Sequence, residues 1–462
     1  MATVSKKRIW GWMSFDWASQ PFYTLGLTFV FGPYFAVVAA EHFMGTGLEE
    51  GAAKAQAQSL WSAGQTIAGL FIAFTAPFLG AFADNSGRKV PWIVLFSIIY
   101  VIATTSLWML EPSGTALILV LVLFYVGFIA AESSLNFVNA ILPSLGTKEE
   151  VGRISGSGAA FGYWGGVVAL AIMLLLFVEQ DNGKTIFVNL DPMFGLDAAE
   201  KEGTRFVGPF IAIWYAVFMI PFFLFVRDDP KAGGKTTSLG AVAGDLWGTL
   251  KSVAQRKSLL NFLVGSMFYR DALNALYAFG GVYAALVLDW SVTQIGVFGV
   301  VAAIAAAVTT WAAGLADRRF GPKPVIRVAV WCLIIVSLTI VFMSREQVYW
   351  IALPIGSTLP DTIFYICGAV IGGAGGAVYS ASRSMMVRHT HPDRPAEAFG
   401  LFALSGKATA FLAPAGITFF TWMTGNTQLG FLPVIFLFLI GLVLLWWVKP
   451  EGDADEWAAH ES

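Results

Sequence analysis

Charged residues are scarce in this chain: they make up 13% of its 462 residues, whereas 57% are hydrophobic. So little polar surface cannot cover the apolar mass in water, which excludes a soluble globular protein. Cysteine is scarce too, and Cys332 and Cys367 stand inside apolar runs, which favours helix packing over metal binding. The net charge of -2 gives no sign of a nucleic-acid partner. No Walker motif occurs, which argues against ATP as the energy source.

The sequence instead contains a series of apolar segments, each long enough to cross a bilayer as a helix. Helices are expected because backbone polar groups in lipid must be satisfied within the segment. The first apolar run is too long for the core of a signal peptide, so we expect a retained transmembrane helix. Twelve segments are predicted, at 15–40, 58–83, 90–110, 114–141, 153–178, 206–227, 259–288, 293–316, 324–343, 361–382, 396–423 and 428–448.

Lysine and arginine are distributed unevenly between alternate loops, and this bias predicts the orientation in the membrane. If the N-terminus is cytoplasmic, the inside loops hold most of these residues, for example Arg88, Lys89 and Lys148, and the outside loops hold few. We therefore expect a multi-pass protein of the plasma (inner) membrane with both termini in the cytoplasm.

A longer inside connection separates the sixth and seventh segments. Its apolar residues Leu239, Val242, Leu246 and Leu250 recur at helical spacing, which predicts an amphipathic helix at the membrane face. The fold class expected is an all-α membrane protein with twelve helices in two pseudo-symmetric six-helix bundles. The predicted parts are an N-terminal bundle at 1–227, a cytoplasmic linker at 228–258, a C-terminal bundle at 259–448 and a cytoplasmic tail at 449–462.

The two halves repeat a sequence pattern. The stretch Phe15–Tyr23 matches Tyr269–Tyr277, with aromatic, charged, Ala, amide and Tyr positions coinciding. Asp84 after the second segment likewise matches Asp317 after the eighth. Internal repeats with binding sites at the midplane between them are typical of secondary transporters.

A charged, glycine-containing loop, Gly80–Lys89, joins the second and third segments. A weaker match to the same pattern occurs at Gly314–Lys323. The loop Gly80–Lys89 resembles the signature loop of the major facilitator superfamily. The resemblance implies that Asp84 faces the inner start of the eleventh helix, near Ala396–Gly400, where a helix N-terminus favours an anion. Arg88 would tie neighbouring helices. We expect a gate that latches the outward-facing state without touching substrate, formed by Gly80, Asp84, Gly87, Arg88, Lys89, Asp317, Arg318 and Arg383.

Further stretches resemble one branch of that superfamily. They include Phe15–Ser19, Tyr269–Asp271, Gly158–Gly166, Ser382–Ser384 and Ser405–Lys407. Together they are similar to the vacuole-effluxer-like branch, whose fungal members export amino acids from the vacuole. The resemblance spans nearly the whole chain and implies an amino-acid-like substrate.

Ionisable residues inside the apolar segments need a reason, because each costs about 2.5–3.5 kcal/mol in hydrocarbon. Asp16, Gln20 and Tyr23 share one face of the first helix through their i, i+4, i+7 spacing. The seventh helix repeats this spacing with Arg270, Asn274 and Tyr277. We expect the two faces to line a central cavity, where Asp16 and Arg270 pair with each other or grip a zwitterion. A purely structural ion pair is the alternative.

Three further ionisable residues are candidates for coupling or binding. Asp271 points about 100° away from Arg270 and is a candidate proton or counter-ion group, or a brace for a neighbouring helix. Glu132 and Asn136 share a face of the fourth helix, and Glu132 is either the proton-coupling acid or a structural hydrogen-bonding group. Lys407 is expected near the middle of the eleventh helix, where it neutralises an acid or binds a substrate carboxylate.

Other conspicuous residues are expected to have structural roles. Arg383 is predicted at the water interface at the inner end of the tenth helix, and His389 and His391 in a cytoplasmic loop without a metal role. Glycines at four-residue spacing permit close helix contact. They form two ridges, Gly158, Gly162 and Gly166 on the fifth helix and Gly368, Gly372 and Gly376 on the tenth.

The function expected is secondary active transport of a small polar or zwitterionic solute by alternating access, with proton coupling. The partners expected are that solute, protons and the lipid bilayer, with no cofactor, metal or nucleic acid, and the protein is expected to be a monomer. Facilitated diffusion, a transporter-fold receptor without flux and an exporter of amphipathic compounds remain alternatives. A membrane enzyme is disfavoured because no metal cluster or nucleophile–base pair is recognisable.

Overall fold

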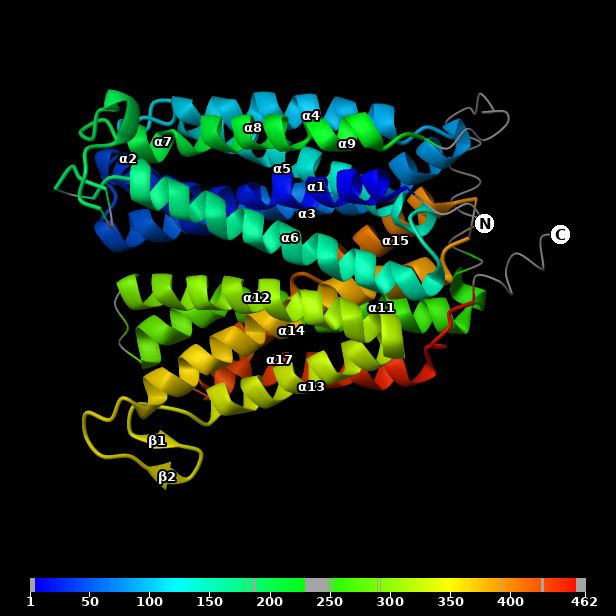
Figure 1. Ribbon diagram of the computed structural model, residues 1–462. Coiled ribbons are helices and arrows are strands. Elements are labelled where there is room, and N and C mark those ends of the chain that lie inside the picture. Colours follow the sequence, from blue (N-terminus) through cyan, green and yellow to red (C-terminus); the bar gives the residue numbers. More distant parts are fainter. Residues whose placement is uncertain are drawn as a thin grey trace. The chain divides into compact units, whose positions relative to one another are not determined.

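The computed structural model describes residues 5–180, 182–185, 188–228, 248, 251, 253–288, 290, 292–391, 393–424 and 428–453. These residues are almost entirely helical (Figure 1). Most of the predicted linker at 228–258, including its amphipathic helix, and the tail beyond Asp453 lie outside the described residues. The longer helices are α1 Lys6–Pro21, α2 Phe31–Gly45, α3 Glu50–Ser86, α4 Val90–Thr105, α5 Leu117–Asn139, α6 Lys148–Leu176, α8 Val207–Phe218, α11 Lys257–Val287, α12 Val292–Phe320, α13 Pro322–Val341, α14 Leu359–His389, α15 Pro395–Ala408, α16 Leu412–Thr424 and α17 Leu432–Leu444.

Shorter elements complete the described chain. A π-helix, η1 (Phe22–Phe29), follows α1, and the short helices α7 (Glu202–Arg205) and α9 (Ile220–Phe225) flank α8. Two strands, β1 (Gln347–Val348) and β2 (Ile351–Ala352), form an antiparallel hairpin between α13 and α14. Short 3₁₀ turns lie at Ser106–Met109, Leu142–Ser144, Met193–Gly195, Leu429–Phe431 and Leu445–Trp447.

Each of the twelve predicted segments corresponds to helical structure. Among the described residues, eleven helices are long and apolar enough to cross a membrane. The remaining predicted segment, 259–288, coincides with α11. An all-helical membrane protein is therefore confirmed.

Several predicted segments are interrupted and do not form a single regular helix; 206–227, for example, divides into α8 and α9 at Met219. The first contains Pro21, whose ring cannot supply a backbone donor, and the chain continues from there as a π-helix to Phe29. The eleventh, 396–423, breaks between the end of α15 at Ala408 and the start of α16 at Leu412. Pro414 lies in the first turn of α16, where its missing N–H is tolerated.

The chain divides into two compact units that do not coincide with the sequence halves. Unit 1 comprises Met1–Ile72, Arg88–Val138 and Phe161–Pro230. Unit 2 comprises Ala73–Gly87, Asn139–Ala160 and Lys231–Ser462. The C-terminal part of α3 and the N-terminal part of α6 thus belong to the unit that holds the second half of the chain. The pseudo-symmetric two-bundle division stays a prediction.

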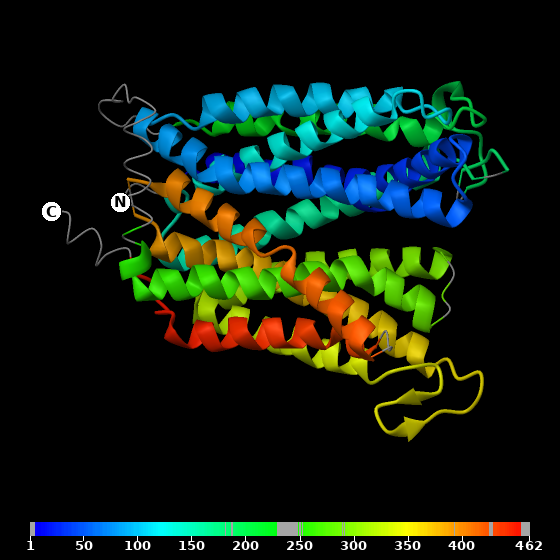
Figure 2. The same cartoon turned by 180° about the vertical axis from the view of Figure 1, so that it is seen from behind.

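Aromatic rings form the core of unit 1. The Trp17 ring stacks on Phe161 and on Trp214, with centroids 4.5 and 5.8 Å away. Tyr215 Oη and Ser97 Oγ share a hydrogen bond of 2.8 Å, which satisfies buried polar atoms of α8 and α4. Seen from behind in Figure 2, helices of this unit lie side by side with their lengths roughly parallel. The Trp17 contacts hold α1 against α6 and α8.

Glycine contacts organise unit 2. A Cβ added at Gly372 of α14 would lie 2.1 Å from the Ala302 carbonyl oxygen of α12, so only glycine permits this approach. Gly368 lies equally close to the Phe298 ring. The predicted packing role of the ridge on the tenth segment is confirmed for these two positions.

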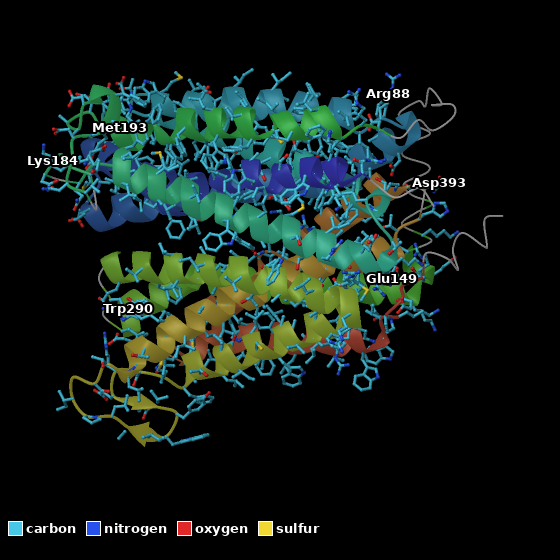
Figure 3. All side chains as sticks on the ribbon, viewed as in Figure 1. Arg88, Glu149, Lys184, Met193, Trp290 and Asp393 are labelled. Carbon is cyan, nitrogen blue, oxygen red and sulfur yellow. The ribbon has the colours of Figure 1, made fainter. Side chains whose placement is uncertain are left out.

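The ends of each unit carry the polar loops. In unit 1, Figure 3 places Arg88 at one end and Lys184 and Met193 at the opposite end. In unit 2, Asp393 and Glu149 lie at one end and Trp290 at the other.

Candidate functional site

Unit 1 contains a polar cluster on α1, η1 and α5. The Tyr23 hydroxyl, in the first turn of η1, donates a hydrogen bond of 3.0 Å to Glu132 Oε1 of α5. Asn136, one turn further along α5, is buried. The structure thus brings together three of the predicted residues, and the half-buried Glu132 carboxyl has a hydrogen-bond donor from the first membrane segment.

Asp16 and Gln20 both lie on α1, on the side that packs against α6. Asp16 is buried, and a Cβ at Gly162 would lie 3.0 Å from its carbonyl oxygen. Gln20 is half-buried, and its Cγ would lie 2.9 Å from a Cβ at Gly166. The glycines of α6 therefore give these polar residues room inside the helix bundle, as the predicted ridge requires.

Arg270 of α11 contacts α15. Its Nη1 donates a hydrogen bond of 3.0 Å to the Phe402 carbonyl oxygen, and its guanidinium lies 4.4 Å from the centre of the Phe402 ring. A Cβ at Gly406 would collide with the guanidinium at 2.3 Å. The guanidinium is thus fitted against the C-terminal half of α15, where the helix dipole is negative.

Asp271, the next residue, contacts the following helix. It is 3% exposed, and its Oδ2 accepts a hydrogen bond of 2.9 Å from the Ala413 N–H. This N–H belongs to the first turn of α16, whose positive end favours a carboxylate. Within the described part of the chain, Asp271 takes part in none of the ion pairs. It is a buried carboxyl held by a backbone donor.

Two adjacent residues of opposite charge therefore contact the two helices that flank one break: Arg270 contacts α15, and Asp271 contacts α16. Lys407 lies in the last turn of α15 beside this break, near the middle of the apolar span Pro395–Ile417, so its predicted role at mid-span stays a prediction. The chain leaves the helical conformation at Thr409, two residues after the lysine. Pro414 was the sequence signal for this break, because a proline favours the first turn of a new helix.

The remaining predicted residues of α11 are more exposed. Asn274 is exposed, and Tyr277 is about half exposed, with its hydroxyl against Gly375 of α14. The predicted meeting of this face with the Asp16 face joins residues of different units, so it stays a prediction.

The predicted gate contact at Asp84 is present within unit 2. Asp84 Oδ2 accepts a hydrogen bond of 2.9 Å from the Glu397 N–H at the start of α15. A Cβ at Gly80 would lie 2.3 Å from the Ala396 carbonyl oxygen, so glycine is required for this approach. At Gly400 a Cβ would lie 2.6 Å from the Ala76 carbonyl oxygen. The end of α3 and the start of α15 are thus packed backbone to backbone.

The remaining residues of the loop Gly80–Lys89 form the expected tight turn. Gly87 has a φ of +66°, a left-handed conformation that favours glycine. Arg88 is exposed. The Lys89 N–H donates a hydrogen bond of 2.8 Å to Asp228 Oδ1, which caps the start of α4. Asp228, from the edge of the linker, was not predicted to have this role.

Arg383 is not at a water interface, and that expectation is wrong. Its side chain is fully buried because α14 continues past it to His389 and residues 139–160 cover it. Its Nη2 and Nε donate hydrogen bonds to Ser155 O (2.8 Å) and Ser155 Oγ (3.1 Å), and Nη1 donates to Asn139 Oδ1 (3.3 Å). Arg383 therefore joins α14 to the end of α5 and the first half of α6.

The second, weaker loop, Gly314–Lys323, shows only part of the contacts made by Gly80–Lys89. Asp317 of α12 is buried, and its Oδ1 accepts a hydrogen bond of 3.3 Å from Ser384 Oγ. A Cβ at Gly152 would lie 2.3 Å from the Asp317 carboxyl carbon, so glycine makes room for the acid. Arg318 is exposed.

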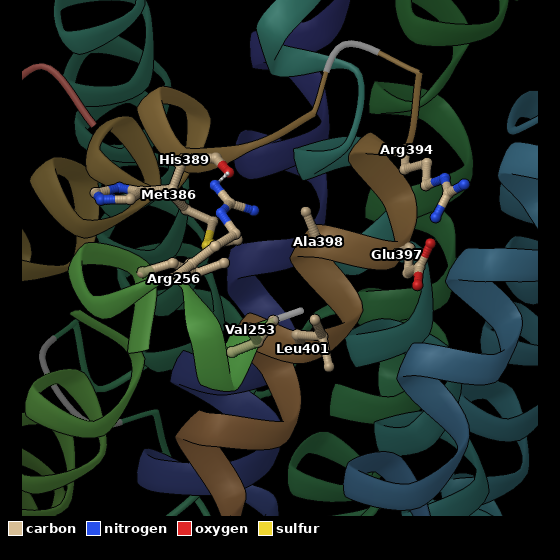
Figure 4. A pocket seen from close by; sticks show the side chains of 9 residues that line it. Val253, Arg256, Met386, His389, Arg394, Glu397, Ala398 and Leu401 are labelled. Carbon is tan, nitrogen blue, oxygen red and sulfur yellow. Dashed lines mark hydrogen bonds between the residues drawn. The ribbon is translucent and has the colours of Figure 1, made fainter. Parts of the chain in front are cut away.

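His389 is likewise buried in the last turn of α14, so its predicted loop position is wrong. Its Nε2 shares a hydrogen bond of 2.8 Å with Ser258 Oγ. Figure 4 shows the neighbouring cavity, in which Arg256 Nη2 donates to the His389 carbonyl oxygen at 2.9 Å. The cavity holds about 10 Å³, enough for one water and too small for an organic solute.

The described helices form an all-helical membrane fold of the kind found in the major facilitator superfamily. Solved structures support this fold. The chain is similar to the proton:xylose symporter XylE, with a TM-score of 0.68, 10% identity and 98% of each chain covered. It is also similar to the human organic anion transporter MFSD10, with a TM-score of 0.62, 15% identity and 96% and 98% covered.

The chain belongs to the family described as "Vacuole effluxer Atg22 like", whose pattern matches residues 4–456. It is 24% identical to the uncharacterized MFS-type transporter YxiO of Bacillus subtilis over 96% of this chain and 95% of that protein. It is 25% identical to autophagy-related protein 22 of Cryptococcus neoformans over 66% of this chain. That match spans 52% of the fungal protein's length. The chain is accordingly a multi-pass secondary transporter of a small molecule, in a family of transporters rather than enzymes.

Proposed function

We propose that this protein moves a small zwitterionic, amino-acid-like solute across the plasma (inner) membrane by alternating access, coupled to protons, with both termini in the cytoplasm. The observation that carries the proposal is Asp271, a carboxyl that is buried in a membrane helix and held by the Ala413 N–H at a helix break. Discontinuous helices with charged groups at the break are a recurring design for coupling sites in transporters.

The contacts that hold Asp271 support proton coupling. A carboxylate there accepts from the Ala413 N–H and faces the positive end of α16, whereas a protonated carboxyl loses most of that attraction. Protonation would therefore weaken the contact between α11 and α16. Because Arg270 holds α15 on the other side of the break, the angle between α15 and α16 would change with the proton.

The zwitterionic substrate class rests on the charges of the two repeats. Asp16 and Glu132 supply carboxyl groups in unit 1, and Arg270 and Lys407 supply cations in unit 2. An ammonium group is recognised by the former and a carboxylate by the latter. The family description "Vacuole effluxer" supports export. The resemblance to the branch whose fungal members export amino acids makes an amino acid the first substrate to test.

We further propose that the Asp84 contact latches one conformational state. The carboxyl sits on the N-terminus of α15, and glycines at 80 and 400 bring the two helices into backbone contact. Asp84→Asn keeps the shape but removes the charge, so it should shift the conformational equilibrium and leave substrate selectivity unchanged. Accessibility of a cysteine at a cytoplasmic position, measured with and without substrate, checks the shift. Altered selectivity with an unaltered equilibrium would contradict this role.

The experiment that tests the proposal is counterflow in proteoliposomes. Purified protein is first screened by thermal shift against amino acids, sugars, peptides and organic acids, and each stabilising compound is then tested for exchange of labelled solute. We expect exchange of an amino acid. Thermal stabilisation without exchange would identify a receptor. Stabilisation only by lipophilic compounds, with their exchange, would identify an exporter of amphipathic compounds.

A further inference from the structure

The hairpin between α13 and α14 presents large apolar side chains to the outside of unit 2. Trp350 is 88% exposed and Ile351 is 70% exposed, and Ile355 is fully exposed just beyond the second strand. Figures 1 and 2 show the hairpin extending sideways from the end of α13, away from the other helices of this unit. Such residues in water would be unfavourable, so their surroundings need an explanation.

The turn at the tip of the hairpin has a strained backbone conformation. Register pairs Val348 with Ile351, so Tyr349 and Trp350 form a two-residue turn. Tyr349 has a φ of +54°, a region that non-glycine residues rarely adopt in such a turn. A glycine would relieve the strain, yet both turn positions carry aromatic rings. The turn therefore presents these rings at the cost of backbone strain.

The tip is held along the outer end of α13. The Tyr349 hydroxyl and Thr339 Oγ1 of α13 share a hydrogen bond of 2.8 Å, and the Tyr349 N–H donates to the Phe342 carbonyl oxygen at 2.6 Å. The Phe342 ring stacks near Tyr349 and Trp350, with centroids 6.1 and 6.4 Å away. The turn is thus fixed to the helix.

The face of α13 next to the tip is exposed and apolar. Val328, Trp331 and Ile335 are exposed at spacings of three and four residues, and the same face leads to Thr339 and Phe342. Because α13 crosses the membrane, an exposed apolar face on it contacts lipid. The aromatic tip continues this lipid-facing surface past the end of the helix.

The base of the hairpin is polar and rigid. Arg345 Nη1 donates a hydrogen bond of 2.7 Å to Asp361 Oδ2 at the start of α14. The Trp290 indole N–H donates to the other oxygen of that carboxylate, and Arg345 also binds the Leu288 carbonyl oxygen. These contacts fix the direction in which the hairpin leaves the helices.

We propose that this hairpin is an interfacial anchor whose tip, Trp350, Ile351 and Ile355, inserts into the headgroup region of the bilayer on the side where α13 ends. Tryptophan and tyrosine prefer this region because their rings are apolar and carry one polar group. The apolar residues of an interfacial segment lie at the boundary between headgroups and acyl chains. The occupant is the lipid surface because the tip is continuous with the lipid-facing side of α13.

The anchor is tested in proteoliposomes of phosphatidylcholine and phosphatidylglycerol. Trp350→Cys is made in full-length protein lacking Cys332 and Cys367, and is labelled with an environment-sensitive fluorophore. Glu346→Cys, an exposed charged position on the same hairpin, is the matched control. We expect the label at 350 to be quenched several-fold more by a lipid nitroxide near the headgroup than by aqueous iodide, and the label at 346 to show the reverse.

Two results would overturn the anchor. Strong iodide quenching at 350, equal to that at 346, would place the tip in water. Protection from both quenchers would place it against protein, as in contact with a second copy. If the cysteine-free protein does not fold, brominated lipids on the otherwise native chain give the same answer, because the difference in quenching between native protein and Trp350→Phe isolates this ring.

Discussion

The two repeated stretches, Phe15–Tyr23 and Tyr269–Tyr277, share a sequence pattern but differ in structure. The first contains Pro21 and passes into a π-helix, so the helix that carries Asp16 is itself irregular. The second lies within the uninterrupted helix α11, and the irregular backbone belongs to its neighbour, between α15 and α16. A repeated polar pattern thus fixes which helices carry the polar groups, but not where the backbone breaks.

The difference assigns different tasks to the two regions. In unit 1 the polar contact is between side chains, Tyr23 and Glu132, on two helices. In unit 2, Arg270 and Asp271 bind backbone groups on either side of a break. A side-chain pair can be displaced by a solute, whereas a contact to a helix terminus positions the helix. We therefore propose that proton coupling depends on Asp271 of unit 2, whereas the acids of unit 1 serve solute recognition.

The largest effect is expected from Asp271→Asn. The amide oxygen can still accept from the Ala413 N–H, so the fold should persist, but the group no longer takes up a proton. Accumulation driven by a proton gradient should fall about tenfold or more, while exchange at equal pH continues. Asp16→Asn should instead raise the KM for solute and keep the proton drive. Uptake by both variants, measured side by side, tests whether the two units have these different tasks.

A suitable control for both variants is Asp191→Asn, because this acid is exposed in a loop of unit 1. Equal loss of proton drive in Asp16→Asn and Asp271→Asn would contradict the division of tasks. Retention of the drive in Asp271→Asn would remove that residue from coupling.

The next effect is expected from Arg270→Gln. The change removes a charged hydrogen bond to the Phe402 carbonyl oxygen and the contact with its ring, which costs about 1.5–3 kcal/mol. Thermal unfolding in detergent should occur at lower temperature, and Arg270→Lys should restore only part of the loss because lysine lacks the planar fork. Arg319→Gln, at an exposed position, serves as the control. A melting temperature equal to that of the control would refute the contact.

The sequence predicts much of this site because charge and spacing identify helix faces. Asp84 illustrates the success: its expected contact at the start of the eleventh segment is present as a hydrogen bond to Glu397. The positions of Asp16, Gln20 and Glu132 on membrane helices follow from spacing in the same way. These features depend on local periodicity and on an interaction with a helix terminus.

The sequence does not predict which backbone groups the charges bind. Arg383 was expected in water because position along a helix says nothing of what covers it, and the covering segment comes from the distant residues 139–160. The break near Thr409, beside Lys407, was not predicted because hydropathy alone does not reveal it. The prolines at 21 and 414 were the available signals, since proline ends or begins regular helices.

The smallest effect is expected from Tyr23→Phe. Loss of the hydroxyl removes one hydrogen bond to Glu132 and should cost about 1 kcal/mol of stability. Tyr277→Phe should cost less because that side chain is about half exposed. The unfolding midpoints of the two variants, compared under one set of conditions, measure the difference. Equal shifts would show that the two repeats hold their tyrosines alike.

The most direct test of proton-coupled transport is proton-driven uptake by the native protein in proteoliposomes. The same vesicles are assayed for an amino acid found by counterflow, with a proton gradient of each sign and with none. We predict that one sign of gradient drives accumulation above equilibrium and that a proton ionophore abolishes it. Equal uptake with and without the gradient, in vesicles that still show counterflow, would contradict proton coupling through Asp271.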